Sequence, residues 1–125
     1  MVPFNLTCTL TLPLIDGQPS VTLPFNFSGQ FKQRGLFDES FTGSGTINIP
    51  MGTIGAPGAL LVIIEHVATQ GAAPIVVTYN GASEGKELAP GGGDLYVNTA
   101  PIVGITAISF DHTTSGRVRA WILGG

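Results

Sequence analysis

With 125 residues, the chain has the length of one ordinary domain, and charged residues make up only 10% of it. Five Lys and Arg against eight Asp and Glu give a formal net charge of −3, which leaves no basic face for a run of phosphates, so we expect no nucleic acid partner. The apolar runs 59–64 and 102–110 are far shorter than the ~20 residues that cross a bilayer, and the start of the chain lacks the basic residues of a secretory signal. We therefore expect a soluble, unprocessed protein with no membrane partner.

The low charge predicts an unusual surface. Thr, Ser, Asn and Gly fill most polar positions, so the exterior should be neutral and rich in hydroxyl groups. Part of the apolar excess is expected to lie in contacts between subunits, which favours a homo-oligomer. Cys8 is the single cysteine, so no disulfide can form within the chain.

The first predicted strands form a hairpin. Apolar and polar residues alternate from Phe4 to Leu12, the pattern of a strand with one face in water. Asp16-Gly17 predicts a reversal of the chain, and alternation resumes over 21–27 as the return strand. Pro24 has no amide hydrogen, which predicts an edge position or a bulge.

The middle of the chain predicts further strands. Alternating segments at 31–37 and 41–49 are separated by Asp38-Glu39-Ser40, which we interpret as a turn. Four Pro and Gly residues make 50–58 a loop. The segment 59–67 is apolar on both faces and therefore predicts a central, covered strand.

The last third continues the pattern. Strands are predicted at 75–79, which ends in the hairpin signal Asn80-Gly81, at 86–88, 94–98, 102–110 and 117–123, with 111–116 as the last turn. Eight to ten strands and no amphipathic helix predict one all-β domain over residues 1–125. We expect an antiparallel β-sandwich, and a jelly roll of about eight strands fits best.

Adjacent acidic and histidine residues are candidates for chemistry. Glu65 and His66 could act as acid and base or bind a metal, but neighbours on a strand point to opposite faces, so one of them is expected to mark an interface or a buried hydrogen bond. Asp111-His112 is expected in a surface turn, with the histidine facing solvent. The glycine-rich segment 89–94 lacks the Lys and the helix of a phosphate-binding loop.

A cupin-like enzyme remains an alternative, but it would need three or four clustered metal ligands, and the chain has two histidines. We predict no catalytic residue, no metal ion and no cofactor, and a protein that is not an enzyme.

The last strand carries the main interface candidates. Alternation places Arg117, Arg119 and Trp121 on one face, and Val118, Ala120 and Ile122 on the core face. Two guanidinium groups beside an indole are typical of the energetic centre of an interface. The alternative is a tryptophan at the end of the sandwich that the arginine stems cover. Termini and long loops can also reach neighbouring subunits, which adds Met1, Val2, Pro3, Phe4, Met51 and Ile54 as candidates.

The second half of the chain resembles a family. Its segments Leu61–Ile64, Ile75–Gly81, Leu88–Gly92, Ile105–Ser109 and Arg117–Gly124 are similar to those of small jelly-roll structural proteins of tailed bacteriophages, over about residues 59–124. The resemblance implies a virion component, a homo-oligomer with a trimer favoured, and partners among the major capsid protein or tail proteins. It implies a capsid decoration (cement) protein that stabilises the particle.

The alternative function is a tail or fibre-tip module that recognises a host-surface glycan. Tyr79-Asn80 and Asp94–Tyr96 could supply the aromatic and polar groups of a sugar site.

Overall fold

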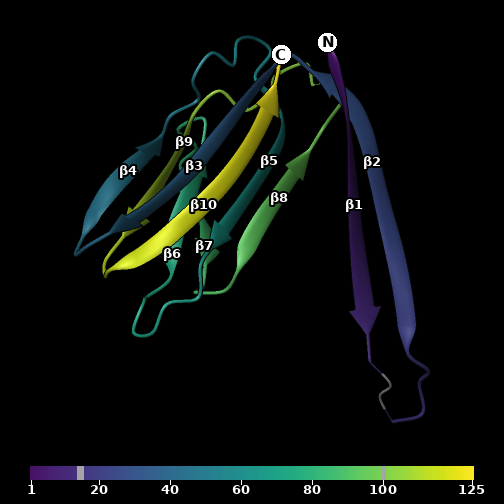
Figure 1. Ribbon diagram of the computed structural model, residues 1–125. Coiled ribbons are helices and arrows are strands. Elements are labelled where there is room, and N and C mark those ends of the chain that lie inside the picture. The colour runs from purple at the N-terminus through teal and green to yellow at the C-terminus, as the bar shows by residue number, and fades with distance from the viewer. Residues whose placement is uncertain (14–15, 100) are drawn as a thin grey trace.

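The computed structural model describes residues 1–13, 16–99 and 101–125. The described residues form ten strands and no helix: β1 (Val2–Leu12), β2 (Val21–Phe31), β3 (Gln33–Phe41), β4 (Gly45–Ile49), β5 (Ala59–His66), β6 (Ile75–Tyr79), β7 (Lys86–Leu88), β8 (Gly93–Val97), β9 (Ile108–His112) and β10 (Gly116–Gly124). Strands β3 to β10 make a sandwich, and β1 and β2 form a separate ribbon beside it (Figure 1). The prediction of an all-β protein is confirmed.

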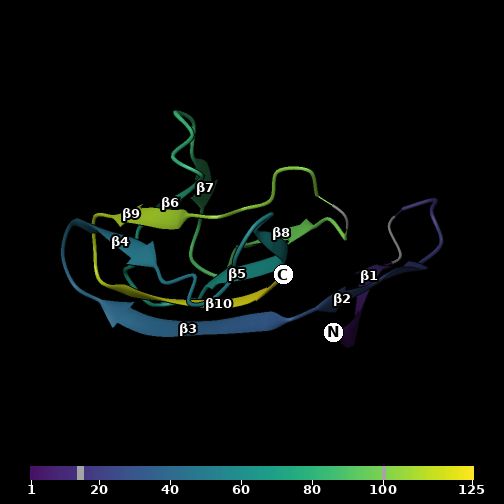
Figure 2. The same ribbon diagram turned by 90° about the horizontal axis from the view of Figure 1, so that it is seen from above.

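The sandwich is a jelly roll. One sheet has the order β3-β10-β5-β8 and is named here the β10 sheet; the other has the order β4-β9-β6-β7 and is named the β9 sheet. The antiparallel pairs β3–β10, β4–β9, β5–β8 and β6–β7 are nested, as if one long hairpin had been rolled up into two layers. Figure 2 shows the two sheets face to face.

The core lies between the inner faces of the two sheets. Phe110 has no exposed surface, and its ring centre lies 5.4 Å from that of Phe41 and 6.3 Å from that of Phe37. Val118, Ala120 and Ile122 are buried there, as the alternation in the last strand predicts. Strand β5 is central, between β10 and β8, which confirms the prediction from its continuous apolar run.

Two predicted boundaries are wrong. The segment Asp38–Ser40 is no turn: it continues β3, because its residues stay in register with Arg117–Arg119 of β10. The chain turns later, where Gly43 adopts a φ of +63°, a left-handed conformation that glycine enters without steric cost.

The strand predicted at 102–110 begins only at Ile108. The Asn80 side chain is the physical reason, because its Oδ1 accepts hydrogen bonds from the amides of Thr106 and Ala107 at 2.8 and 3.1 Å. These amides are therefore not available to a sheet ladder. Ile102 and Val103, predicted to lie in that strand, stand in the preceding loop with 96% and 78% of their surface exposed.

The ribbon of β1 and β2 is named here the arm. Its register runs from Val2 opposite Phe31 to Leu12 opposite Val21, which confirms the predicted hairpin. Pro24 lies in β2, and this strand pairs with β1 alone, so its other edge forms no hydrogen bonds with a further strand. The edge position predicted from Pro24 is therefore confirmed. The arm extends along one side of the sandwich, beyond β8, and belongs to neither of its sheets (Figures 1 and 2).

Candidate interaction surface

One face of the arm is apolar along its whole length. Side chains directly opposite each other on paired strands share a face, and the pairs on this face are Val2–Phe31, Phe4–Gly29, Leu6–Phe27, Cys8–Phe25, Leu10–Leu23 and Leu12–Val21. The opposite face carries the pairs Pro3–Gln30, Asn5–Ser28, Thr7–Asn26, Thr9–Pro24 and Thr11–Thr22. The arm is therefore amphipathic, with a clean division between its two faces.

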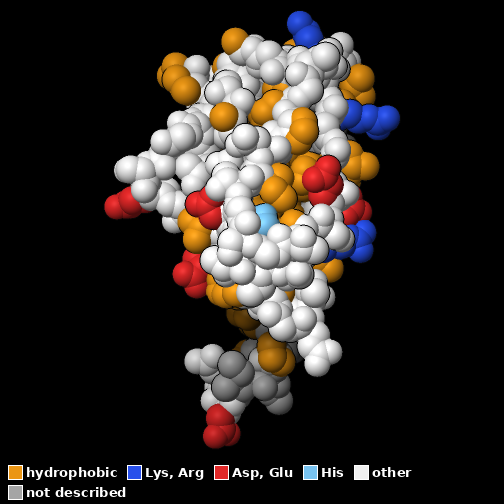
Figure 3. Space-filling model, turned by 90° about the vertical axis from the view of Figure 1, so that its left-hand side faces the viewer, with side chains coloured by type: hydrophobic (Ala, Val, Ile, Leu, Met, Phe, Trp, Pro, Cys, Tyr) orange, Lys and Arg blue, Asp and Glu red, His pale blue; other side chains and the backbone are white. Residues whose placement is uncertain are grey.

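The apolar face is exposed over the outer half of the arm. Phe25, Leu10 and Leu12 expose 46%, 45% and 43% of their surface. In the space-filling view, the end of the arm projects beyond the body of the protein (Figure 3). Large apolar side chains that gather on one protruding face mark an interaction site.

The base of the arm is tied to the sandwich. Phe4 is buried and stacks at a tilt on Phe31, with 6.3 Å between ring centres. Position 29 is glycine because a Cβ there would lie 2.9 Å from the Phe4 ring and 3.1 Å from the methyl group of Thr99. One residue, Lys32, joins β2 to β3, and its amide donates a 2.9 Å hydrogen bond to the carbonyl of Gly124.

The outer face of the β10 sheet carries a second apolar surface. Its register aligns one large apolar side chain from each strand in a row, Leu36–Trp121–Ile63–Leu95, which is named here the apolar row. Leu36, Leu95 and Trp121 expose 71%, 43% and 42% of their surface. Outer faces of a sandwich are normally polar, so this row is an interface candidate.

A groove connects the two apolar surfaces. It has a volume of about 530 Å³ and is lined by Phe31, Arg34, Gly35, Leu36, Trp121 and Leu123. Phe31 belongs to the apolar face of the arm, and Leu36 and Trp121 belong to the apolar row. The two surfaces therefore meet at the point where the arm leaves the sandwich.

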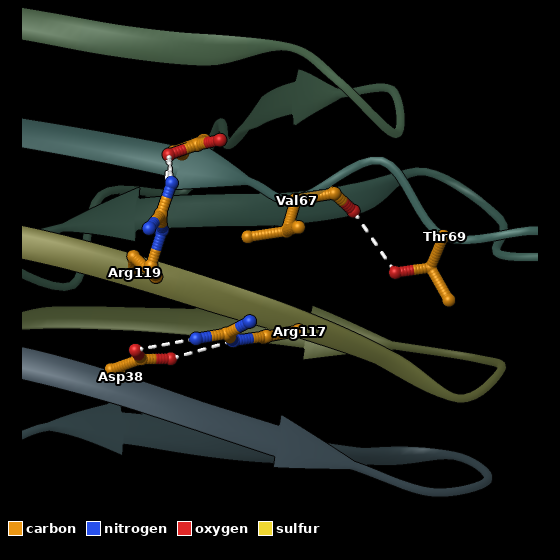
Figure 4. Close-up of polar contacts among 6 residues, drawn as sticks. Asp38, Val67, Thr69, Arg117 and Arg119 are labelled. Carbon is orange, nitrogen blue, oxygen red and sulfur yellow. Dashed lines mark hydrogen bonds and ion pairs between the residues drawn. The ribbon is translucent and has the colours of Figure 1, made fainter.

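Ion pairs border the apolar row. Arg117 donates two hydrogen bonds to the Asp38 carboxylate, at 2.8 and 2.7 Å (Figure 4). The hydrogen bond to Arg117 lowers the pKa of Asp38, and the same bond raises the pKa of Arg117. Arg119 donates to Glu65 at 2.6 Å, and its guanidinium lies 5.7 Å from the centre of the Trp121 ring. Both predicted arginines are thus paired on their own chain, and Arg119 lies beside the exposed Trp121.

The remaining interface candidates lie in two places. Met1 precedes the arm and Val2 begins it, and they expose 72% and 52% of their surface; Pro3 lies on the polar face and Phe4 is buried at the base. Met51 and Ile54 are half-buried and pack against the core of their own sandwich. The interface role of all these residues stays a prediction.

The acidic and histidine residues do not converge. Glu65 and His66 point to opposite faces of β5, as predicted, and the buried His66 ring places Nδ1 3.0 Å from the carbonyl oxygen of Leu88. The prediction for His112 is wrong: it exposes only 7% of its surface, because β9 continues through it opposite Gly45 of β4. Within the described ranges, no three His, Cys, Asp or Glu residues are placed to hold a metal ion.

The residues considered for a glycan site are engaged within the chain. The Tyr79 hydroxyl donates to Asp94 at 2.6 Å, and burial together with this carboxylate raises the pKa of Tyr79. Asn80 accepts hydrogen bonds from the 106–107 amides and donates to Gly104 at 3.0 Å. The amide of Gly91, in the glycine-rich segment, donates to the carbonyl of His66 at 2.7 Å. The glycan-binding role of Tyr79, Asn80, Asp94 and Tyr96 stays a prediction.

No helix among the described residues has the length and hydrophobicity to cross a membrane. The chain matches no protein-family model, and comparison with curated proteins and with solved structures finds no significant match. The chemistry of the surface is therefore the basis for a functional proposal.

Proposed function

We propose that the protein is a structural subunit that self-associates through the apolar face of the arm, and that the homo-oligomer decorates a phage capsid as a cement protein. The single observation that carries the self-association is the apolar face of the arm, which runs from the pair Val2–Phe31 to the pair Leu12–Val21 and is exposed over its outer half. The role is binding rather than catalysis.

The physics of a two-stranded ribbon supports this proposal. An isolated hairpin is at best marginally stable in water, and it needs a further layer on its apolar face. Removing a Leu or Phe side chain from water contributes roughly 1.5–3 kcal/mol. Phe25, Leu10 and Leu23 expose 40–46% of their surface in the single chain, so a partner that covers them gains somewhat less than half of this contribution from each side chain.

The charged groups also support a binding role. Three acidic residues form ion pairs with basic residues of the same chain. The pairs are Asp38–Arg117, Glu65–Arg119 and Asp94–Lys86. Figure 3 shows a surface with few charged side chains and much neutral area. Such a surface suits contact with a repeating lattice, in which weak contacts multiply over many copies. The resemblance of residues 59–124 to phage jelly-roll proteins is the reason why we propose a phage capsid as the particle.

The test compares two neighbouring positions on opposite faces of the arm. Leu10→Asp places a charge on the apolar face, and Thr11→Asp places the same charge on the polar face. We expect light scattering to give the mass of an oligomer, with a trimer favoured, for both the unchanged protein and Thr11→Asp. Leu10→Asp should give the mass of one chain, because an interface does not tolerate an unpaired buried charge.

Cosedimentation with capsid shells of the phage that encodes the chain tests the second half of the proposal. We expect the unchanged protein and Thr11→Asp to sediment with the shells and Leu10→Asp to stay in solution. A monomeric mass for the unchanged protein would contradict self-association. An oligomer that does not sediment with the shells would contradict the capsid role alone.

A further inference from the structure

We propose that the apolar face of each arm is covered by the outer face of the β10 sheet of a second copy, so that subunits exchange arms. This inference rests on the proposed self-association and specifies the surface that receives the arm. The receiving surface is the apolar row and the groove next to it.

The two surfaces match in chemistry and in length. The arm presents Leu and Phe side chains from paired strands, and the sheet presents Leu, Ile and Trp side chains in one row. The apolar row crosses the four strands of the β10 sheet and spans roughly 14 Å between the outermost two, and the exposed outer half of the 11-residue arm strands spans roughly 18 Å. A ribbon laid on this sheet would form a third layer, about 10 Å away, as sheets do when they stack face to face.

The arm cannot cover the outer face of its own sheet in this conformation. Lys32 is the single residue between β2 and β3, and its hydrogen bond to Gly124 fixes the point of departure. Phe4 and Thr99 both lie against Gly29 and hold the base of the ribbon at the end of the sandwich. Beyond that point the arm runs along the side of the sandwich, away from the faces of both sheets (Figures 1 and 2). A second copy is not restricted in this way.

Packing of the arm on a sheet accounts for both exposed surfaces. Two arms packed face to face would bury Phe25 and Leu10 but would leave Leu36 and Trp121 in water. An arm on a neighbouring sheet covers both sets at once. The groove at Phe31 makes the two surfaces continuous within each subunit, so one subunit can give an arm and receive an arm side by side.

The area of the contact favours a closed assembly. The exposed outer half of the arm, roughly 18 Å long and 10 Å wide, presents a smaller face than a stable interface, which buries about 800 Å² on each partner. A subunit that both gives and receives an arm buries about twice the area of one contact. Reciprocal exchange is therefore favoured over one unreciprocated arm.

Cys8 provides a native probe for the test. It is the single cysteine of the chain and lies on the apolar face of the arm, opposite Phe25. A second thiol is introduced at either end of the apolar row, as Leu95→Cys or Leu36→Cys. The matched control is Asn48→Cys, at an exposed position of β4 in the β9 sheet. Circular dichroism and light scattering confirm the fold and the mass of each variant before oxidation.

We expect oxidation to link Cys8 of one chain to the introduced thiol of another in at least one of the two sheet variants. The product should be a reducible ladder of dimers and larger species, with the linked peptides identified by mass spectrometry. Because thiols held together have a high effective concentration, the yield should exceed that of Asn48→Cys by roughly tenfold or more. Adding Cys8→Ser to the same variant should remove the ladder.

The other outcomes separate the two proposals. A dimer through Cys8 of both chains, with no link to the sheet, overturns the inference in favour of arms packed on one another. A link between Cys8 and the sheet within one chain also overturns it. An oligomeric mass with no link from either sheet position overturns the inference and leaves self-association intact. A monomeric mass overturns both proposals.

Discussion

The arm and strand β10 share one sequence pattern but differ in what covers it. In β10, every second residue points into the core, and Val118, Ala120 and Ile122 expose at most 1% of their surface. In the arm, the same alternation leaves Leu10 and Phe25 almost half exposed. The difference lies in the second layer, because the β9 sheet covers β10 whereas the arm belongs to a sheet of two strands with no layer of its own. A period of two thus determines which residues share a face, and the topology determines whether that face is dry.

We predict that truncating one phenylalanine in each region affects a different quantity. The change in β9 of the core should lower the free energy of unfolding, and the change in the arm should weaken association. Phe110→Ala should lower the free energy of unfolding by about 3–5 kcal/mol, because it leaves a cavity among Phe37, Phe41 and His112. Urea unfolding monitored by circular dichroism measures the loss.

Phe25→Ala is the matched change in the arm. At a concentration where the unchanged protein is monomeric, it should alter the free energy of unfolding by less than about 1 kcal/mol, as expected of an exposed side chain. The oligomer should instead dissociate at a higher concentration, by roughly tenfold or more. Equal losses of unfolding free energy in the two variants would show that the arm belongs to the cooperative core.

A polar cluster that joins the two sheets should have an intermediate effect. Asp94 of β8 accepts hydrogen bonds from Tyr79 of β6 and from Lys86 of β7. Burial opposes ionisation of Asp94, but the bonds from Tyr79 and Lys86 outweigh it and lower the pKa of its carboxyl group. Asp94→Asn should therefore lower the free energy of unfolding at neutral pH by about 1.5–3 kcal/mol, the usual contribution of hydrogen bonds to a charged group.

The sign of the pH dependence follows from the lowered pKa. Below the usual value of 3.8, the unfolded chain takes up a proton at Asp94 more readily than the folded one. The contribution of Asp94 is thus complete above that pH and is lost on further acidification. Unfolding curves of the two proteins should converge at acid pH, and a constant difference would contradict this account of the cluster.

The ion pair on the outer face of the β10 sheet should have the smallest effect. Asp38 and Arg117 expose 39% and 45% of their side chains, so water and salt screen their attraction. Asp38→Asn should leave the melting temperature almost unchanged at physiological salt. A large shift in the melting temperature, or a shift that persists at high salt, would indicate that the pair is buried in an interface.

The sequence predicts the existence of the strands better than their boundaries. Alternation and turn residues are local signals, and they correctly predict β1, β2, β5 and β6. The end of β3 and the start of β9 depend on distant partners, namely the register of β3 with β10 and the side chain of Asn80. His112 is buried for the same kind of reason, through its pairing with β4.

The candidate site could be predicted only in part. The sequence indicates Trp121 and the two arginines, because they alternate on one strand. It does not indicate the apolar row, since Leu36 and Leu95 become neighbours of Trp121 and Ile63 only through the sheet register. The apolar face of the hairpin is visible as a pattern, but its exposure follows from the position of the arm outside the sandwich.

Hydrogen exchange along the chain tests the central claim most directly. We predict slow amide exchange in both the arm and strands β5 and β10 of the unchanged protein at a concentration where it is associated. In Leu10→Asp, the amides of β1 and β2 should exchange much faster, while those of β5 and β10 should keep their protection. Arm amides that exchange at the same rate in both proteins, whether fast or slow, would contradict the claim that association covers the arm.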